Sequence, residues 1–522
     1  MSKIDPVATP TSRKAVVTSA GGIVASQSRL AASVGAEVLV AGGNAVDAAV
    51  ATSFALGALE PWMSGIGGGG YLVLAPSNGT PPQVIDCSMV APAALDPRDY
   101  PLVEGTGPGG FGWPAVRDDR NLKGASSVAV PGLVAGLGLA LEGFGTIDWR
   151  SALAPAIALA ERGLPVDWFS TLSIAVEARE LVEFDGVREV YLPDGLPPAP
   201  ADDGVAHLPL GNLARTLRRL AEAGPRDFYE GEIAGSVTRE LRAAGGSLAP
   251  EDLSGYHASV RPALEIDYRG ITVSTVPGLT AGPTLAAVLR ALTGTLRPRA
   301  PAAGPDAAAY RAYAATLAAA YEERFTTLGH ASPASSCTTH LCVVDRHGTL
   351  VALTQTLLSR FGSKLLLPET GILLNNGIMW FDPRPGRPNS LAAGKRPLSN
   401  MCPVVITRDG APWAALGASG GRRIIPAIVQ LTSFMVDFGM PLEKAFAVPR
   451  LDASTDKVVC DNRFPPEVVE ALSARLPVEI VENTLYPGHF ANPSAVMRPQ
   501  ASNLNTGMAH IYSPSAAAMV GG

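Results

Sequence analysis

Cysteine is scarce in this chain of 522 residues, which has only five, and no two of them form a CxxC pair. This argues against both a disulfide framework and a zinc site, and it fits a reducing compartment. No uninterrupted apolar run of about 20 residues occurs, so we expect no membrane span. No apolar stretch precedes the Ser-Arg-Lys sequence at residues 12–14, so we expect no secretory signal and a cytoplasmic protein.

Strong charge of either sign is also missing, because 41 Lys and Arg and 47 Asp and Glu leave a net charge of -6. The basic residues are scattered rather than striped, so we expect neither nucleic acid nor an anionic membrane as a partner. The seven histidines form no HExxH or HxH pattern, so the sequence does not support a metal site. Chemistry on small molecules is the remaining expectation.

One glycine run matches the GxGxxG dinucleotide fingerprint at residues 65–70, and Asp86 stands at about the right distance for a ribose contact. That motif needs a strand before the glycines and a helix after them. Here a predicted helix at 44–59 precedes the run and a predicted strand at 71–75 follows it. We therefore expect a tight turn that lets backbones approach closely, and no organic cofactor.

The sequence pattern differs between the first and the last part of the chain. Helical periodicity predicts amphipathic helices in the first part, at residues 44–59, 208–223, 232–244 and 306–323. A segment of small residues at 331–337 has no periodicity and is expected to be exposed and flexible. Short β-branched runs then predict strands at 338–345, 349–357 and 402–408 and a helix at 425–438, in a three-strand unit with one helix. The length suggests about three domains, with one large intertwined domain as the alternative.

Thr338 opens the first of these strands, directly after Cys337. A threonine hydroxyl needs a base to become a nucleophile, and an N-terminal threonine carries one in its own α-amine, whose pKa is roughly 7.7–8.0. Freeing that amine requires cleavage between Cys337 and Thr338, which the same hydroxyl can perform by attacking the Cys337 carbonyl. A threonine at a strand start is also an ordinary β-former, so the residues around it must decide.

Those surroundings resemble the gamma-glutamyltranspeptidase (glutathione hydrolase) family of N-terminal-nucleophile hydrolases. The similar blocks, in chain order, are GGNAVDAAVA, SGIGGGG, AVPGLVAGL, TTHLCVVDRHGTLVALTQT, GILLNN, KRPLSNMCP and GASGGRRI. The resemblance implies an α+β fold, a four-layer αββα sandwich in which residues 1–337 and 338–522 form one intertwined domain. It also implies self-cleavage into a heterodimer, with a dimer of heterodimers as a further option, and no cofactor.

The resemblance assigns roles by position. Thr338 corresponds to the nucleophile, and Thr356 to the threonine that hydrogen-bonds the nucleophile's amine and steers processing. Gly420 and Gly421 correspond to the pair whose N–H groups form the oxyanion hole. His340 belongs to the motif without serving as the base, and is expected to be structural.

The predicted substrate-binding residues depart from the family. Ser399 and Asn400 keep hydrogen-bonding groups near the acyl group, with Asn in place of a common second serine. Ser88 stands where glutathione-processing members have an arginine for the substrate α-carboxylate, and Trp380 stands where they have a carboxylate for the α-ammonium. Leu358 replaces a familiar asparagine.

Three arginines bear on the substrate. Arg422 stands beside the oxyanion glycines, where the family often has a small polar residue, and Arg384 and Arg387 lie in the loop that follows Trp380. They indicate an anionic acyl group, unless they are solvated or paired with structural acids such as Asp382.

The sequence therefore predicts an amide hydrolase or acyltransferase that acts on a small, carboxylate-bearing amide, similar to oxamate amidohydrolases and glutaryl-cephalosporin acylases. The alternatives are a hydrolase or transpeptidase for gamma-glutamyl compounds such as glutathione, and an unprocessed, non-catalytic binding protein on the same fold.

Overall fold

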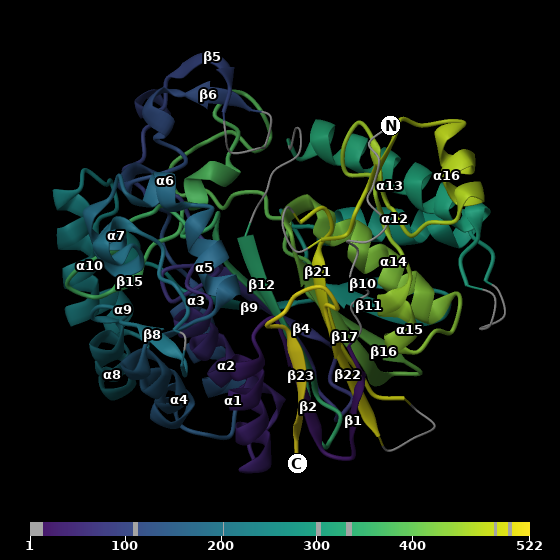
Figure 1. Ribbon diagram of the computed structural model, residues 1–522, viewed down its shortest axis with the longest axis horizontal. Coiled ribbons are helices and arrows are strands. Elements are labelled where there is room, and N and C mark those ends of the chain that lie inside the picture. Colours follow the sequence, from purple (N-terminus) through teal and green to yellow (C-terminus); the bar gives the residue numbers. More distant parts are fainter. Residues whose placement is uncertain are drawn as a thin grey trace.

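Two seven-stranded sheets form the centre of the protein (Figure 1). The computed structural model describes residues 14–107, 113–201, 203–298, 304–329, 337–484, 488–499 and 504–522. The first sheet has the order β1 (Val17–Ser19), β22 (Asn505–Ala509), β21 (Asn492–Met497), β17 (Ala411–Ser419), β16 (Val404–Arg408), β11 (Ile271–Thr275) and β10 (Leu264–Tyr268). The second has the order β23 (Ala517–Gly521), β2 (Gly22–Ser26), β12 (Cys337–Val344), β13 (Leu350–Leu358), β3 (Gly69–Ala75), β4 (Gln83–Cys87) and β9 (Ser259–Pro262).

Helices cover the outer face of each sheet. The second sheet packs against a helical layer that includes α1 (Arg29–Val40), α2 (Ala45–Leu59), α3 (Leu133–Phe144) and α4 (Trp149–Arg162). The first sheet packs against α12 (Gly282–Thr295), α13 (Ala307–Thr327) and α14 (Ile424–Val436). A third apolar cluster lies between the sheets. The expected α+β, four-layer αββα sandwich is confirmed.

Strand β12 shows how the sequence creates these layers. Its side chains alternate between the two faces of the sheet, as in any β-strand. Leu341 and Val343 belong to the cluster beneath α1 and α2, whereas Cys342 and Val344 belong to the cluster between the sheets. Both faces are buried, which explains the nearly continuous apolar run.

Each sheet combines strands that precede residue 337 with strands that follow it. In the first sheet β1, β10 and β11 come from the earlier part of the chain, and in the second β2, β3, β4 and β9 do. The expected three-strand unit was wrong in one respect: β12 and β13 form a hairpin, but Val404–Arg408 lies in the other sheet, paired with β11 and β17. Local sequence does not encode such long-range pairing.

The predicted helices occur with shifted ends. They are α2, α8 (Leu213–Ala223), α10 (Glu232–Ala243), α13 and α14. Asn44 caps α2 by accepting from Val46 and Asp47 backbone N–H groups. Of the segment 331–337, which we expected to be exposed and flexible, residues 331–336 lie outside the described residues; Cys337 is buried at the start of β12, because it pairs with β13, so the expectation was wrong for it. In the part of the chain that the structure describes, no helix is both long and apolar enough to cross a membrane.

Candidate active site

The start of the β12–β13 hairpin holds the predicted cleavage position. Cys337 pairs with Leu358 and Thr339 pairs with Gln355, so the register shifts at Thr338. Thr338 is 2% exposed. The hydroxyl of Thr356 donates a hydrogen bond to the carbonyl oxygen of Cys337 and accepts one from the Leu358 N–H at 2.8 Å. In the uncut chain, Thr356 therefore contacts the carbonyl that Thr338 would attack.

The glycine run at residues 65–70 packs against this hairpin. A Cβ atom on Gly68 would lie 2.3 Å from the carbonyl oxygen of Thr356, and one on Gly67 would lie 2.1 Å from that of Leu373. Helix α2 precedes the run and β3 follows it. The predicted close backbone approach is confirmed, and the backbone that the glycine run packs against includes that of Thr356.

Gly420 and Gly421 lie at the end of β17, at the start of the 3₁₀ turn η6 (Gly421–Arg423). Their φ angles are 129° and 63°, a region that favours glycine. Strand β17, which leads into η6, packs against β12, and the ring of His340 lies directly on Gly417. The glycine pair and the predicted cleavage position therefore occupy the same region of the fold.

His340 lies between the sheets. Its Nδ1 is 2.8 Å from the Thr354 hydroxyl, its Nε2 is 3.0 Å from Cys342 Sγ, and its ring packs directly on Gly417 of β17. Burial lowers the pKa of His340 to about 3, so the imidazole is neutral at physiological pH. This supports the expected structural role. Burial raises the pKa of the Cys337 thiol, so it is a poor nucleophile.

Ser399 and Asn400 are held by an arginine that the sequence analysis did not select. The buried guanidinium of Arg324, on α13, donates to the Ser399 carbonyl at 2.8 Å and to Asn400 Oδ1 at 3.0 Å. It also donates to the carbonyl of Thr280 and the hydroxyl of Thr284. With Oδ1 engaged, the Asn400 Nδ2 group is buried and has no hydrogen-bond partner among the described residues.

Two other predicted substrate-binding residues also carry buried, unpaired donors. Within the described ranges, neither the Trp380 indole N–H nor any guanidinium nitrogen of Arg422 has a hydrogen-bond partner. Arg422 lies 5.2 Å from the ring centroid of Phe325. The pKa of Arg422 is lowered to about 10, mainly by burial, while nearby Asp452 opposes this shift and nearby Arg324 adds to it. Within the described residues, the guanidinium of Arg422 therefore lacks the hydrogen-bonded partner that buried charges normally require.

Hydrogen bonds connect the chain segments that carry two of these donors, Trp380 and Asn400. The Asn389 side chain donates to the Trp380 carbonyl at 2.5 Å and accepts from the Leu398 N–H at 3.0 Å, next to Ser399. Arg324 then links the 399–400 segment to the neighbourhood of Arg422. Asn389 has no motif signal, and Arg324 reads from the sequence as part of a solvated helix end.

The remaining predicted residues are either paired with other side chains or exposed. The Ser88 hydroxyl donates to Asp86 at 2.7 Å and accepts from Arg396 at 2.6 Å. Arg384 pairs with the buried Asp382 at 2.7 Å, as its structural alternative predicted. Arg387 is exposed. Of the three arginines, only Arg422 is buried without a partner in the described region.

The sequence and fold can be compared with known proteins at this point. The family model described as Gamma-glutamyltranspeptidase matches residues 31–335 and 320–509. The chain belongs to the gamma-glutamyltranspeptidase family. It is 33% identical over 505 residues to the Acylase ACY 1 proenzyme of Pseudomonas sp. (strain V22), with 90% of this chain and 89% of that protein covered.

Other members of the gamma-glutamyltranspeptidase family show the same relation. The Glutathione hydrolase proenzyme of Escherichia coli (strain K12) is 30% identical over 508 residues, covering 87% of this chain and 85% of that protein. The crystal structure of cephalosporin acylase from Bacillus halodurans superposes with a TM-score of 0.85 at 25% identity, covering 99% of both chains. The chain is therefore a gamma-glutamyltransferase-like amide hydrolase with the N-terminal-nucleophile hydrolase fold, and the expected acylase-like branch fits.

Proposed function

We propose that this family member is a self-processing amide hydrolase that uses Thr338 as its nucleophile and prefers a carboxylate-bearing acyl group without an α-amine. One observation carries the substrate class: the buried, unpaired groups at Trp380, Asn400 and Arg422 are all donors. A buried donor needs an acceptor. A carboxylate supplies acceptors and charge, whereas an α-ammonium would bring further donors.

Processing would begin at the Cys337 carbonyl. The Thr338 Oγ1 attacks this carbon, the hydroxyl proton passes to the peptide nitrogen, and the C–N bond breaks, so that an ester links Cys337 to Thr338 Oγ1 and the released nitrogen becomes the new α-amine of Thr338. Water then hydrolyses the ester and leaves Cys337 with a free carboxylate. The Thr356 hydroxyl supports this scheme, because its hydrogen bond to the Cys337 oxygen stabilises negative charge as it develops there.

Turnover would follow the same pattern. The freed α-amine of Thr338 takes the hydroxyl proton, Oγ1 attacks the substrate amide, and the N–H groups of Gly420 and Gly421 stabilise the oxyanion. The amine leaves with the proton and an ester remains on Thr338. Water releases the acid and restores the hydroxyl; an amine acceptor would give transfer instead. The fragments 1–337 and 338–522 would stay together as a heterodimer.

The nucleophile is tested by intact mass and denaturing electrophoresis of wild type, Thr338→Ala and the control Thr349→Ala. Thr349 is a suitable control because it lies beside the same hairpin, immediately before β13. We expect two fragments, starting at Met1 and Thr338, in wild type and in the control, and one uncut chain in Thr338→Ala. A single chain in all three would reject self-processing.

The acyl preference is tested by comparing kcat/KM for glutaryl, oxamyl and gamma-glutamyl amides with a common anilide leaving group where the chemistry allows. The glutaryl and gamma-glutamyl compounds differ by one α-amino group, so their ratio reports directly on its acceptance. We expect glutaryl turnover to exceed gamma-glutamyl turnover by at least 10-fold. Faster gamma-glutamyl turnover would favour the glutathione hydrolase alternative.

A further inference from the structure

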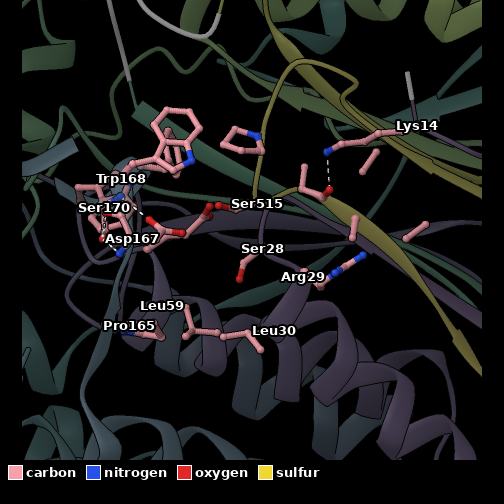
Figure 2. Close-up of a pocket in the computed structure, with 18 of the residues that line it drawn as sticks. Lys14, Ser28, Arg29, Leu30, Leu59, Pro165, Asp167, Trp168, Ser170 and Ser515 are labelled. Carbon is pink, nitrogen blue, oxygen red and sulfur yellow. Dashed lines mark hydrogen bonds between the residues drawn. The ribbon is translucent and has the colours of Figure 1, made fainter. Parts of the chain in front are cut away.

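A separate cavity lies behind the nucleophile strand, on the helical side of the second sheet. Its volume is about 640 Å³, within the range of small-molecule sites. It is lined by residues from the segment 14–17, from α1 and the end of α2, from α5 (Trp168–Ala175) and from the segment before β23. None of the predicted substrate-binding residues lines it. Figure 2 shows Lys14 and Arg29 on one side and Asp167 and Trp168 on the other.

One side of the cavity is cationic. The Lys14 ammonium donates to the carbonyls of Ser513 and Ala516. Burial, together with the nearby positive charge of Arg29, lowers the pKa of Lys14 to about 8. The Arg29 side chain has no hydrogen-bond or ion-pair partner in the described part of the chain. An anion between the two would relieve their repulsion and pair with Arg29.

The other side holds acids. Asp167 uses its carboxylate to cap α5. Glu60, at the end of α2, is 4% exposed and accepts a hydrogen bond from the Thr339 hydroxyl at 3.0 Å. That hydroxyl is the only partner the described structure gives the Glu60 carboxylate, so no cation compensates its charge. The ammonium group of a ligand would compensate the charge of Glu60.

The rim is apolar. Trp168 is 56% exposed and Leu30 is 44% exposed, and Leu59, Trp62 and Phe169 line the cavity behind them. Exposed apolar side chains at the mouth of a charged cavity suit a ligand with an apolar group of its own.

We propose that this cavity is a second small-molecule site that takes an apolar zwitterion, a free amino acid or short peptide, with its carboxylate at Lys14 and Arg29 and its ammonium at Glu60. The site is distinct from the proposed active site, which lies on the opposite face of β12. It touches that site indirectly, because Glu60 holds Thr339 next to Thr338.

Glycyl-L-leucine is the probe, and its binding to uncut Thr338→Ala protein is measured by isothermal titration calorimetry at pH 7.5. In this variant the nucleophile is absent, so the result does not depend on the proposed reaction. N-acetyl-glycyl-L-leucine lacks the ammonium and glycyl-L-leucinamide lacks the carboxylate. We expect saturable binding of the probe and at least 10-fold weaker binding of both derivatives.

Arg29→Ala and Glu60→Gln should each weaken probe binding by at least 10-fold. Arg290→Ala, which removes an exposed arginine of α12, should leave it unchanged. Absence of saturable probe binding at 10 mM, or equal binding by the peptide and both derivatives, overturns the proposal. So does full binding by Arg29→Ala, a residue at the exposed start of α1 whose replacement leaves the core intact.

Discussion

Arg422→Met removes a buried charge that has no hydrogen-bonded partner among the described residues. Burial lowers the pKa of Arg422 to about 10 from its ordinary 12.5, which corresponds to about 3 kcal/mol of unfavourable free energy for the charged form. At pH 8, below both values, this cost is fully present. Methionine fills much of the same space without charge. We expect the free energy of unfolding to rise by about 2–3 kcal/mol.

The expected change in melting temperature follows from the size of the chain. Unfolding entropy is about 2.1 cal/mol/K per residue, which gives about 1.1 kcal/mol/K for 522 residues. The melting temperature of Arg422→Met should therefore rise by about 2–3 °C, measured by differential scanning calorimetry at pH 8 on uncut Thr338→Ala background.

Activity should change in the opposite direction. Loss of a buried charge partner costs at least about 2 kcal/mol, so kcat/KM for a glutaryl anilide should fall by about 30-fold or more in otherwise wild-type protein. Turnover of an acetyl anilide, which has no carboxylate, should change little. Arg290→Met is the matched control, because that arginine is exposed, and it should alter neither stability nor turnover.

A lower melting temperature together with unchanged glutaryl turnover would refute this reasoning. It would mean that the Arg422 guanidinium stabilises the fold and does not meet the acyl group. A fall in acetyl and glutaryl turnover by the same factor would also contradict it, because the loss would then be independent of the carboxylate.

Three further changes have defined outcomes. Thr356→Val removes the donor to the Cys337 carbonyl and should slow self-cleavage by about 100-fold in an electrophoretic time course; unchanged cleavage would contradict this. Gly420→Ala places a Cβ 2.9 Å from the Cα of Ala491 at φ 129°, so the melting temperature should fall, reflecting about 1–3 kcal/mol of strain, and turnover should be lost. Burial raises the pKa of Glu60 to about 7 from 4.5, so the free energy of unfolding of the wild type should decrease as pH rises between these values. The free energy of unfolding of Glu60→Gln should equal that of the wild type at pH 4 and exceed it by about 3 kcal/mol at pH 8. Equal values for the two proteins at both pH values would contradict this.

Elements with strong local patterns were predictable. Asn44 and the apolar run after it mark α2, and the β-branched runs mark β12 and β13 with ends shifted by one residue. The sheet to which β16 belongs was not predictable. Its two partner strands are Ile271–Thr275 and Ala411–Ser419, and only the second is close to β16 in the chain.

Site residues were predictable where their position in a motif identifies them. They were not predictable where their role comes from the packing of elements that are distant in the chain. Thr338 and Thr356 follow from motif positions, but Arg324 acts only because α13 packs on the first sheet and directs its guanidinium to the 399–400 segment. Similarly, Ser88 meets Arg396 across 308 positions of the chain. No sequence window contains such a contact.

Both sheets combine strands from before and after residue 337, so a cleaved protein that unfolds completely cannot easily refold. While the bond at residue 337 is intact, the two parts share one chain and their encounter is intramolecular. Once it is cut, reassembly after complete unfolding becomes a second-order reaction and loses the high effective concentration of a tether. Of the seven strands of these two sheets that precede residue 337, four (β1, β2, β3 and β11) pair with strands that follow it and would each have to find those partners again in another molecule. A cut protein would therefore depend on slow unfolding for its lifetime, and its native assembly would be set once, during its first folding.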